Sequence, residues 1–172
     1  MTAPSATVAN MLGDAYADLD QELATTRRIL ERFPDDKGDW GPHDKSRTIG
    51  QLAAHVANLP GLAGSILSTD YLDVTKRMPA PEKNTAAELV EFFDTQTEFL
   101  RKAIADTKPE DLDKSWSLRM GDRVLITQTR RTLLRVMFLS HMIHHRAQLG
   151  VYYRLLNVSV PSVYGPTADE PI

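Results

Sequence analysis

The chain has 172 residues, a formal net charge of −3 and no cysteine. Its length fits a single domain spanning residues 1–172, with a core large enough to need no crosslinks. Without cysteine the chain has no disulfide, no thiolate metal ligand and no cysteine nucleophile, so any metal ion must be held by histidine or carboxylate. The acidic balance argues against a nucleic-acid partner.

Although the net charge is negative, one segment is rich in arginine, with Arg119, Arg123, Arg130, Arg131 and Arg135. We interpret it as the solvated side chains of a hairpin and a helix start, not as a phosphate-binding track. No apolar run approaches membrane-spanning length, and the N-terminus lacks the basic start and apolar centre of a signal peptide. We therefore expect a cytoplasmic protein with no membrane partner.

Four segments carry apolar residues at steps of three and four, which is the period of an amphipathic helix. They predict helices over residues 8–33, 48–67, 85–106 and 129–156. The second and third open with Thr48–Gln51 and Thr85–Glu88, which match the capping-box pattern of Ser or Thr followed three residues later by Glu or Gln. Pro60 should kink or interrupt the second helix, and Thr127 or Thr129 should cap the fourth.

The connections between these helices differ in length. A linker with two prolines runs from about Thr69 to Lys83, and a short hairpin with its turn at Gly121-Asp122 is predicted between Trp116 and Ile126. We expect the hairpin to cross from one end of the helices to the other. The tail from Val160 to Pro166 cannot extend a helix, because of its prolines and glycine, and should form an irregular cover or be disordered. The sequence therefore predicts an all-α fold, a four-helix bundle with a short β-hairpin before the last helix.

The aromatic residues of the third and fourth helices should serve packing. Phe92, Phe93 and Phe99 lie at helical spacing, which predicts that they face the core. We interpret Tyr152 and Tyr153 as core and interface residues rather than substrate contacts.

The stretch from Phe138 to Gly150 holds three of the five histidines. His141 and His145 are four residues apart, so a helix places them on one face, one turn apart, as two imidazoles must be to bind one metal ion. His144 competes with His145 for this pairing. In a bundle, metal sites are built from facing helices, which makes His55 on the second helix the natural third ligand.

Three blocks of sequence follow one another in a characteristic order. They are Thr48-Ile-Gly-Gln-Leu-Ala-Ala-His55, then Ser140-His141-Met-Ile-His-His145-Arg-Ala-Gln-Leu-Gly150, then Val160-Pro-Ser-Val-Tyr-Gly-Pro166. In these blocks the chain resembles the DinB/YfiT-like family of metalloenzymes, and the likeness covers essentially its whole length.

The resemblance implies a four-helix bundle that holds a divalent metal ion, most often zinc or nickel, on three histidines. Carried onto this sequence, these are His55, His141 and His145. The family belongs with transferases that use low-molecular-weight thiols such as bacillithiol or mycothiol, and many members form homodimers. His144 is then expected to pack between helices or at a dimer face.

Three neutral imidazoles leave the charge of the metal uncompensated and at least one coordination position open. An open position lowers the pKa of a bound water to about 7 or deprotonates a bound thiol, and either species is a nucleophile near neutral pH. The chain is not a zincin protease, because Met142 and Ile143 follow the first histidine where that motif requires a glutamate.

No catalytic residue is assigned from the sequence. His43, Asp39 and Asp44 are candidates for a general base only by their position in a loop. Gln148 lies three residues after His145 on the same helical face, where it either contacts a metal ligand or the substrate, or forms a hydrogen bond within the bundle.

Three functions agree with these features. The first is a metal-dependent enzyme, with thiol-dependent transfer to a small electrophilic substrate favoured over hydrolysis. The second is a metal-binding stress-response or binding module without turnover. The third is an interaction protein whose histidines are structural.

Overall fold

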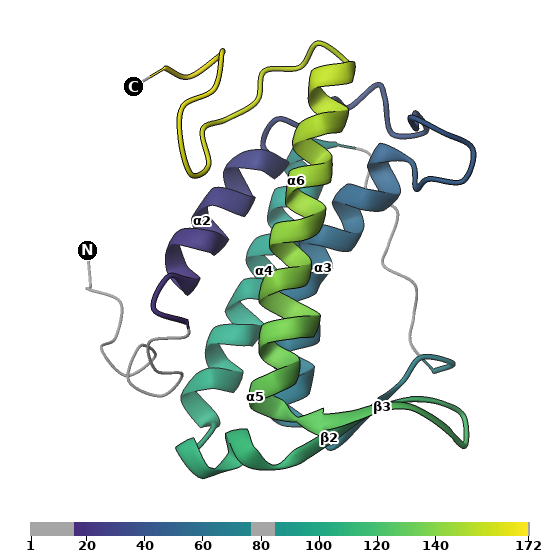
Figure 1. Ribbon diagram of the computed structural model, residues 1–172, viewed down its shortest axis with the longest axis vertical. Helices are drawn as coiled ribbons and strands as arrows, with labels where there is room; N and C mark the ends of the chain where they lie inside the picture. Colours follow the sequence, from purple (N-terminus) through teal and green to yellow (C-terminus); the bar gives the residue numbers. More distant parts are fainter. Residues whose placement is uncertain (1–15, 77–84, 172) are drawn as a thin grey trace.

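The structure, a computed structural model, describes residues 16–76 and 85–171. Its helices are α2 (Leu19–Leu30), α3 (Ile49–Ser68), α4 (Ala86–Asp106) and a last long helix made of three parts. These parts are α5 (Arg130–Leu133), a π-helical segment (Leu134–Leu139) and α6 (Ser140–Leu155). The predicted all-α bundle of four helices is confirmed, with a small sheet at one end (Figure 1).

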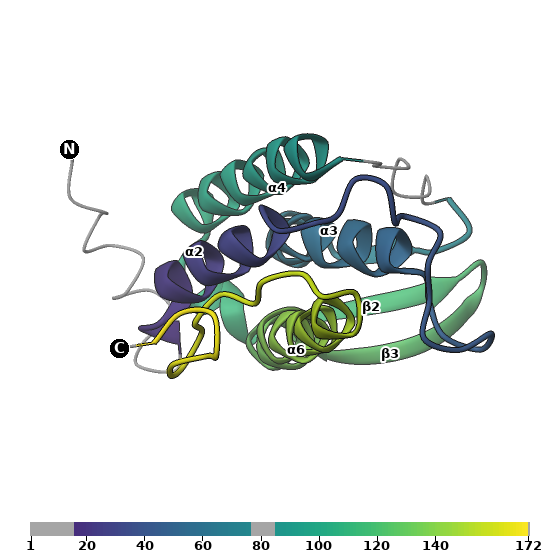
Figure 2. The same cartoon turned by 90° about the horizontal axis from the view of Figure 1, so that it is seen from above.

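The helices run up, down, down and up in chain order, as Figure 1 shows for α2, α3, α4 and α6. Because α3 and α4 run in the same direction, the connection between them must span the length of the bundle. Seen from above, α2 and α3 lie between α4 on one side and α6 on the other (Figure 2). The most extensive helix contact joins α3 and α4, and α6 packs on α3 and α2.

The small sheet has the strand order β1 (Tyr71–Asp73), β2 (Ser115–Met120), β3 (Arg123–Thr129). The predicted hairpin is β2 and β3, and its turn residue Gly121 has φ +59°, a conformation that favours glycine. Strand β1, which pairs parallel to β2, was missed because three residues are too few to show an alternating pattern.

The hairpin does not cross the bundle, so this expectation was wrong. The end of α4 and the start of α5 lie at the same end of the molecule, and β2 and β3 project from that end (Figure 1). An antiparallel step from α4 to α5 needs only a local connection, and a short 3₁₀ helix at Pro109–Asp113 together with the hairpin supplies it.

Capping residues fix where three helices begin. Both predicted capping boxes are present, with the side chains of Thr48 and Thr85 accepting hydrogen bonds from the backbone N–H three residues on. Of the two threonines considered for the last helix, Thr129 is the cap, since its Oγ1 accepts from Thr132 N at 3.3 Å.

One predicted helix range was too long, and of the two effects predicted for Pro60 the interruption is excluded. Helix α2 is shorter than predicted, because residues 16–18 and 31–33 lie outside it, and residues 8–15 lie outside the described part of the chain. Pro60 is buried within α3 but does not interrupt it, since one helix runs from Ile49 to Ser68.

Small residues let α4 approach α3 closely. A Cβ at Gly61 would lie 1.9 Å from Gln96 Oε1, and one at Gly64 would lie 2.6 Å from Phe99 Cε1. The ring of Phe99 is thus laid across Gly64 at the edge of the helix pair, where it stays 41% exposed. Its expected place in the core was wrong, whereas Phe93 is buried as predicted.

The interpretation of the arginine cluster also needs correction. Arg130 is buried, and its guanidinium donates to Thr69 O at 3.0 Å and to Asp70 Oδ1 at 3.2 Å. Arg119 lies over the ring of Tyr71, and Arg131 pairs with Asp113. The correction concerns Arg130, since Arg123, Arg131 and Arg135 are exposed as expected. Strand β1, absent from the predicted fold, brings Asp70 and Tyr71 beside Arg130 and Arg119.

Of the two outcomes left open for the C-terminal tail, the structure shows an irregular cover. Helix α6 ends at Leu155, Asn157 just beyond it has a φ of +57°, and Val158 N donates back to Tyr153 O at 2.9 Å, as in a Schellman motif. The tail then returns over α2 and α6 (Figure 2). Within the described part of the chain, no helix has the length and apolar character needed to cross a membrane.

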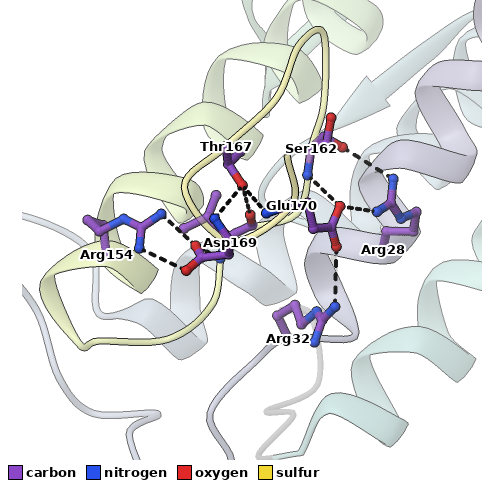
Figure 3. A network of polar contacts seen from close by, with 8 residues as sticks. Arg28, Arg32, Arg154, Ser162, Thr167, Asp169 and Glu170 are labelled. Atoms are coloured by element: carbon purple, nitrogen blue, oxygen red, sulfur yellow. Dashed lines mark hydrogen bonds and ion pairs between the residues drawn. The ribbon is translucent and has the colours of Figure 1, made fainter. Parts of the chain in front are cut away.

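Two carboxylates fasten this tail to the helices (Figure 3). Asp169 pairs with Arg154 of α6 at 2.6 Å and accepts from Val160 N. The hydrogen bond from Arg154 holds the pKa of Asp169 below its ordinary value. Glu170 accepts from Ser162 N and pairs with Arg28 at 2.6 Å and Arg32 at 3.4 Å.

A buried ion pair joins α2 to α6 beneath the tail. Arg146 and Glu22 have 2% and 3% of their surface exposed, and Arg146 Nη2 lies 2.7 Å from Glu22 Oε2. Arg146 Nη1 donates to Thr26 Oγ1 and to the carbonyl of Glu22, and the hydroxyl of Tyr164 donates to Glu22 Oε1. Buried charges are tolerated only when they are paired and hydrogen-bonded in this way.

We expect Arg146→Met to destabilise the protein by about 3–5 kcal/mol, because it leaves the carboxylate of Glu22 buried without its cation. Urea denaturation measures the loss. The double variant Glu22→Gln/Arg146→Met should recover part of it. The control Arg154→Met breaks a half-exposed pair and should cost less than about 1 kcal/mol. Equal losses for Arg146→Met and Arg154→Met would contradict this account.

Candidate metal centre

Three histidines meet at the contact between α3 and α6. His55 comes from α3, and His141 and His145 come from successive turns of α6. Their nearest ring nitrogens all lie within 4.8 Å of one another, and each ring is half-buried. His141 Nε2 lies 3.2 Å from His55 Nε2 and 2.8 Å from His145 Nε2. Residues separated by about 90 positions in the chain therefore present their Nε2 atoms to one point.

In two of these rings the other nitrogen, Nδ1, is hydrogen-bonded to an oxygen that can only accept. His141 Nδ1 lies 3.2 Å from Met137 O, and His145 Nδ1 lies 2.7 Å from Gln148 Oε1. Both Nδ1 atoms therefore carry a proton. In a neutral imidazole the second nitrogen then holds a lone pair, so the Nε2 lone pairs of His141 and His145 face each other.

Two lone pairs at 2.8 Å repel unless a cation lies between them. A tetrahedral zinc ion with Zn–N bonds of about 2.0–2.1 Å holds its nitrogen ligands roughly 3.3 Å apart, close to the spacing here. The donor set consists of three imidazoles, and the orientation of two of them, His141 and His145, is fixed by a hydrogen bond at Nδ1, as is usual for metal-binding histidines. These residues fit a divalent transition-metal ion.

The surroundings of His145 favour its neutral form. Burial lowers the pKa of His145, and the nearby basic groups of His141, His144 and Arg47 lower it further, against the opposing effect of its hydrogen bond to Gln148. A neutral imidazole is the form that binds metal, so metal and proton compete at the same nitrogen.

The other sequence candidates take different positions. His144 is exposed, and its ring lies beside that of His145 with a centroid distance of 4.9 Å, outside the group of three. Gln148 contacts His145, one of the two roles considered for it. His43, Asp39 and Asp44 are all exposed, and His43 Nδ1 accepts from Lys45 N within the loop.

The loop before α3 contributes residues that the sequence did not predict for the site. The ring of Trp40 packs edge-on against Tyr152, with centroids 5.6 Å apart, and the Tyr152 hydroxyl donates to Arg47 O. Tyr152 lies seven residues after His145, so helical spacing could have placed it on the same face. No local sequence pattern predicts that Arg47 contacts this face of α6.

Three convergent histidines on two facing helices of a four-helix bundle are typical of helical proteins that can bind a metal ion inside the bundle. Residues 8–171 match the sequence profile of the DinB family. The chain belongs to the DinB family.

Individual relatives are distant. The uncharacterized protein YrdA of Bacillus subtilis is 22% identical over 149 residues, which cover 87% of this chain and 85% of YrdA. A DinB-like protein from Bacillus cereus has a similar structure, with a TM-score of 0.66 and 19% identity over 87% of this chain and 95% of that one. The DinB-like protein YjoA of Bacillus subtilis has a TM-score of 0.68 and 20% identity over 88% of this chain and 97% of YjoA. At this identity the likeness establishes the shared fold.

We expect His55→Ala, His141→Ala and His145→Ala each to lose the bound metal, because two imidazoles hold a divalent ion far more weakly than three. Elemental analysis of gently purified protein measures the metal per chain. The matched control is His144→Ala, which removes a neighbouring imidazole from the exposed face and should keep the wild-type metal content. Equal metal loss in the His144 variant would show that the ligand set is wrong.

Proposed function

We propose that this protein is a metal-dependent enzyme whose divalent ion, zinc or nickel, is held by His55, His141 and His145. The proposal rests on the convergence of three Nε2 atoms. Two of them belong to rings whose Nδ1–H groups donate hydrogen bonds to Met137 O and Gln148 Oε1. A bound divalent ion would supply a Lewis acid with an open position, able to hold water or a thiol in its deprotonated form near neutral pH.

The chain itself supplies the orientation of that ion. Met137 O and Gln148 Oε1 fix the rings of His141 and His145, so that their Nε2 lone pairs point to the shared position. The group of three contains no carboxylate, so the charge of the ion is left for an anionic ligand to balance. A thiolate is such a ligand, which supports thiol-dependent transfer to a small electrophilic substrate.

The resemblance to thiol-using members of the family supports the same reaction class. Hydrolysis needs a group that takes a proton from water, and no carboxylate is among the three clustered residues. We therefore rank a metal-dependent hydrolase below a transferase. A metal-binding stress-response module without turnover is the other alternative, and it shares the metal site but not the reaction.

The thiol proposal is tested by mixing metal-loaded protein with an electrophile such as monochlorobimane and a panel of thiols that includes bacillithiol and mycothiol. We expect conjugation at least about tenfold faster than the uncatalysed reaction for one thiol, and no acceleration with the His141→Ala variant. Fluorescence of the conjugate gives the rate. Metal-loaded protein that accelerates no thiol would favour the module without turnover.

We also propose that the protein forms a homodimer through the outer face of α6. His144, Ala147, Val151 and Leu155 lie on one stripe of this helix, and Val151 and Leu155 are 59% and 58% exposed. An exposed apolar stripe of this kind is typical of an interaction surface. The expectation of a dimer comes from the family resemblance, and this stripe supports it.

We expect Val151→Asp to convert a dimer into a monomer, because it places a charge in the middle of the apolar stripe. Analytical ultracentrifugation reports the mass. The control is Val124→Asp on strand β3, where the side chain is 51% exposed but lies away from α6, and which should stay dimeric. A wild-type protein that is monomeric at high micromolar concentration would refute the proposed interface.

A further inference from the structure

We call the side of the three-histidine site where the start of α3 meets the end of α6 its entrance, because the histidines are only half-buried. On α6, His145, Gln148 and Tyr152 lie on one face over two turns. The hydroxyl of Tyr152 donates to the carbonyl of Arg47, the residue immediately before the N-cap of α3, at 3.3 Å. The backbone of Arg47 is thereby held against the same face of α6 that carries the histidines.

The loop around Arg47 is held by further contacts. Trp40 packs edge-on against Tyr152, and Trp40 O accepts from Ile49 N at 2.7 Å, so the loop closes on the first turn of α3. The Arg47 side chain itself remains exposed. A fixed backbone with an exposed guanidinium beside a metal site is suited to contact a molecule entering from solvent.

The titratable groups that act on His145 are those of His141, His144 and Arg47, all of them basic. Burial has the largest effect on the pKa of His145, and the positive charge of Arg47 lowers it in the same direction. No carboxylate appears among these groups.

Gln148 adds a neutral donor at the same place. Its Oε1 accepts from His145 Nδ1 at 2.7 Å, so its NH₂ group points away from the imidazole. Gln148 lies one turn before Tyr152, and therefore between the histidines and the carbonyl of Arg47. A guanidinium binds a carboxylate through charge-assisted hydrogen bonds, and an amide N–H can donate one more.

We propose that Arg47, with the amide of Gln148, selects an anionic molecule for this site: a compound bearing a carboxylate or a similar oxyanion beside the atom that binds the metal ion. This inference rests on the proposed metal site. It adds the substrate class, which the three histidines alone do not define. The oxyanion can belong to the thiol or to the electrophile, since both reach the same entrance.

The test uses full-length protein loaded with Co²⁺, whose visible spectrum changes when a ligand enters its coordination shell. The protein is titrated with 3-mercaptopropionate, 2-mercaptoethanol and cysteamine, which carry a negative, a neutral and a positive group beside the same thiol. Propionate, which has the carboxylate but no thiol, forms a fourth titration. The readout is binding and does not depend on turnover.

We expect wild-type protein to bind 3-mercaptopropionate about tenfold more tightly than 2-mercaptoethanol, as one charge-assisted contact predicts. In Arg47→Gln this preference should fall to about twofold or less, while Arg47→Lys should keep part of it, because lysine retains the charge without the planar fork. The matched control is Lys45→Gln, which removes an equal charge two residues away in the same loop and should keep the full preference.

Several results would overturn the inference. They are equal affinity of the wild type for the charged and neutral thiols, a preference that survives in Arg47→Gln, or an equal loss in Lys45→Gln, which would reflect overall charge. Binding of propionate but of no thiol would support Arg47 and contradict thiol transfer. Failure of Co²⁺ to bind would remove the metal site and this inference with it, an outcome distinct from a lost preference in metal-loaded protein.

Discussion

The structure depends on the close approach of α3 and α6, which brings His55 Nε2 to 3.2 Å from His141 Nε2, beside the 2.8 Å contact that His141 and His145 make one turn apart on α6. Neutral imidazoles do not gather in this way without a reason, because their lone pairs repel. The protons on the far side of two rings are fixed by Met137 O and Gln148 Oε1, so the rings cannot relieve the repulsion by changing tautomer. A cation at the shared point would turn this repulsion into attraction, which is the physical basis of the proposed metal site.

The opposite face of α6 carries a second buried electrostatic contact. Arg146 follows His145 directly, and its side chain enters the contact with α2, where Glu22 and Thr26 receive it. The same helix is thus held to α3 through the histidines and to α2 through an ion pair. The tail adds a cover over the second contact, where Tyr164 bridges to Glu22 and where Asp169 and Glu170 bind arginines of α6 and α2. These contacts fix the rotation of α6, which is what aims His141 and His145 toward α3.

The balance of charge explains why the proposed chemistry uses an anion. Three neutral ligands do not offset the charge of a divalent ion, and the entrance adds the guanidinium of Arg47. A thiolate or an oxyanion lowers the electrostatic energy of such a site, whereas a cationic ligand raises it. The proposed transferase and the proposed recognition of an anionic group therefore follow from the same excess of positive charge, although they are tested separately.

The sequence by itself determined the features that depend on near neighbours. Periodicity predicted the four helices, Thr48 and Thr85 fixed two of their starts, and Gly121 marked the hairpin turn, because each signal lies within a few residues. It also placed His141 and His145 on one face, while the grouping with His55 needed the bundle and the family resemblance. Only the tertiary structure decided the short strand β1, the place of the hairpin, the burial of Arg130, the pair of Glu22 with Arg146 and the return of Arg47 to the site. Each of these features depends on contacts between residues that are distant in the chain. A local sequence pattern does not predict which distant side chain will pair with a charge or which distant segment will pair with a strand.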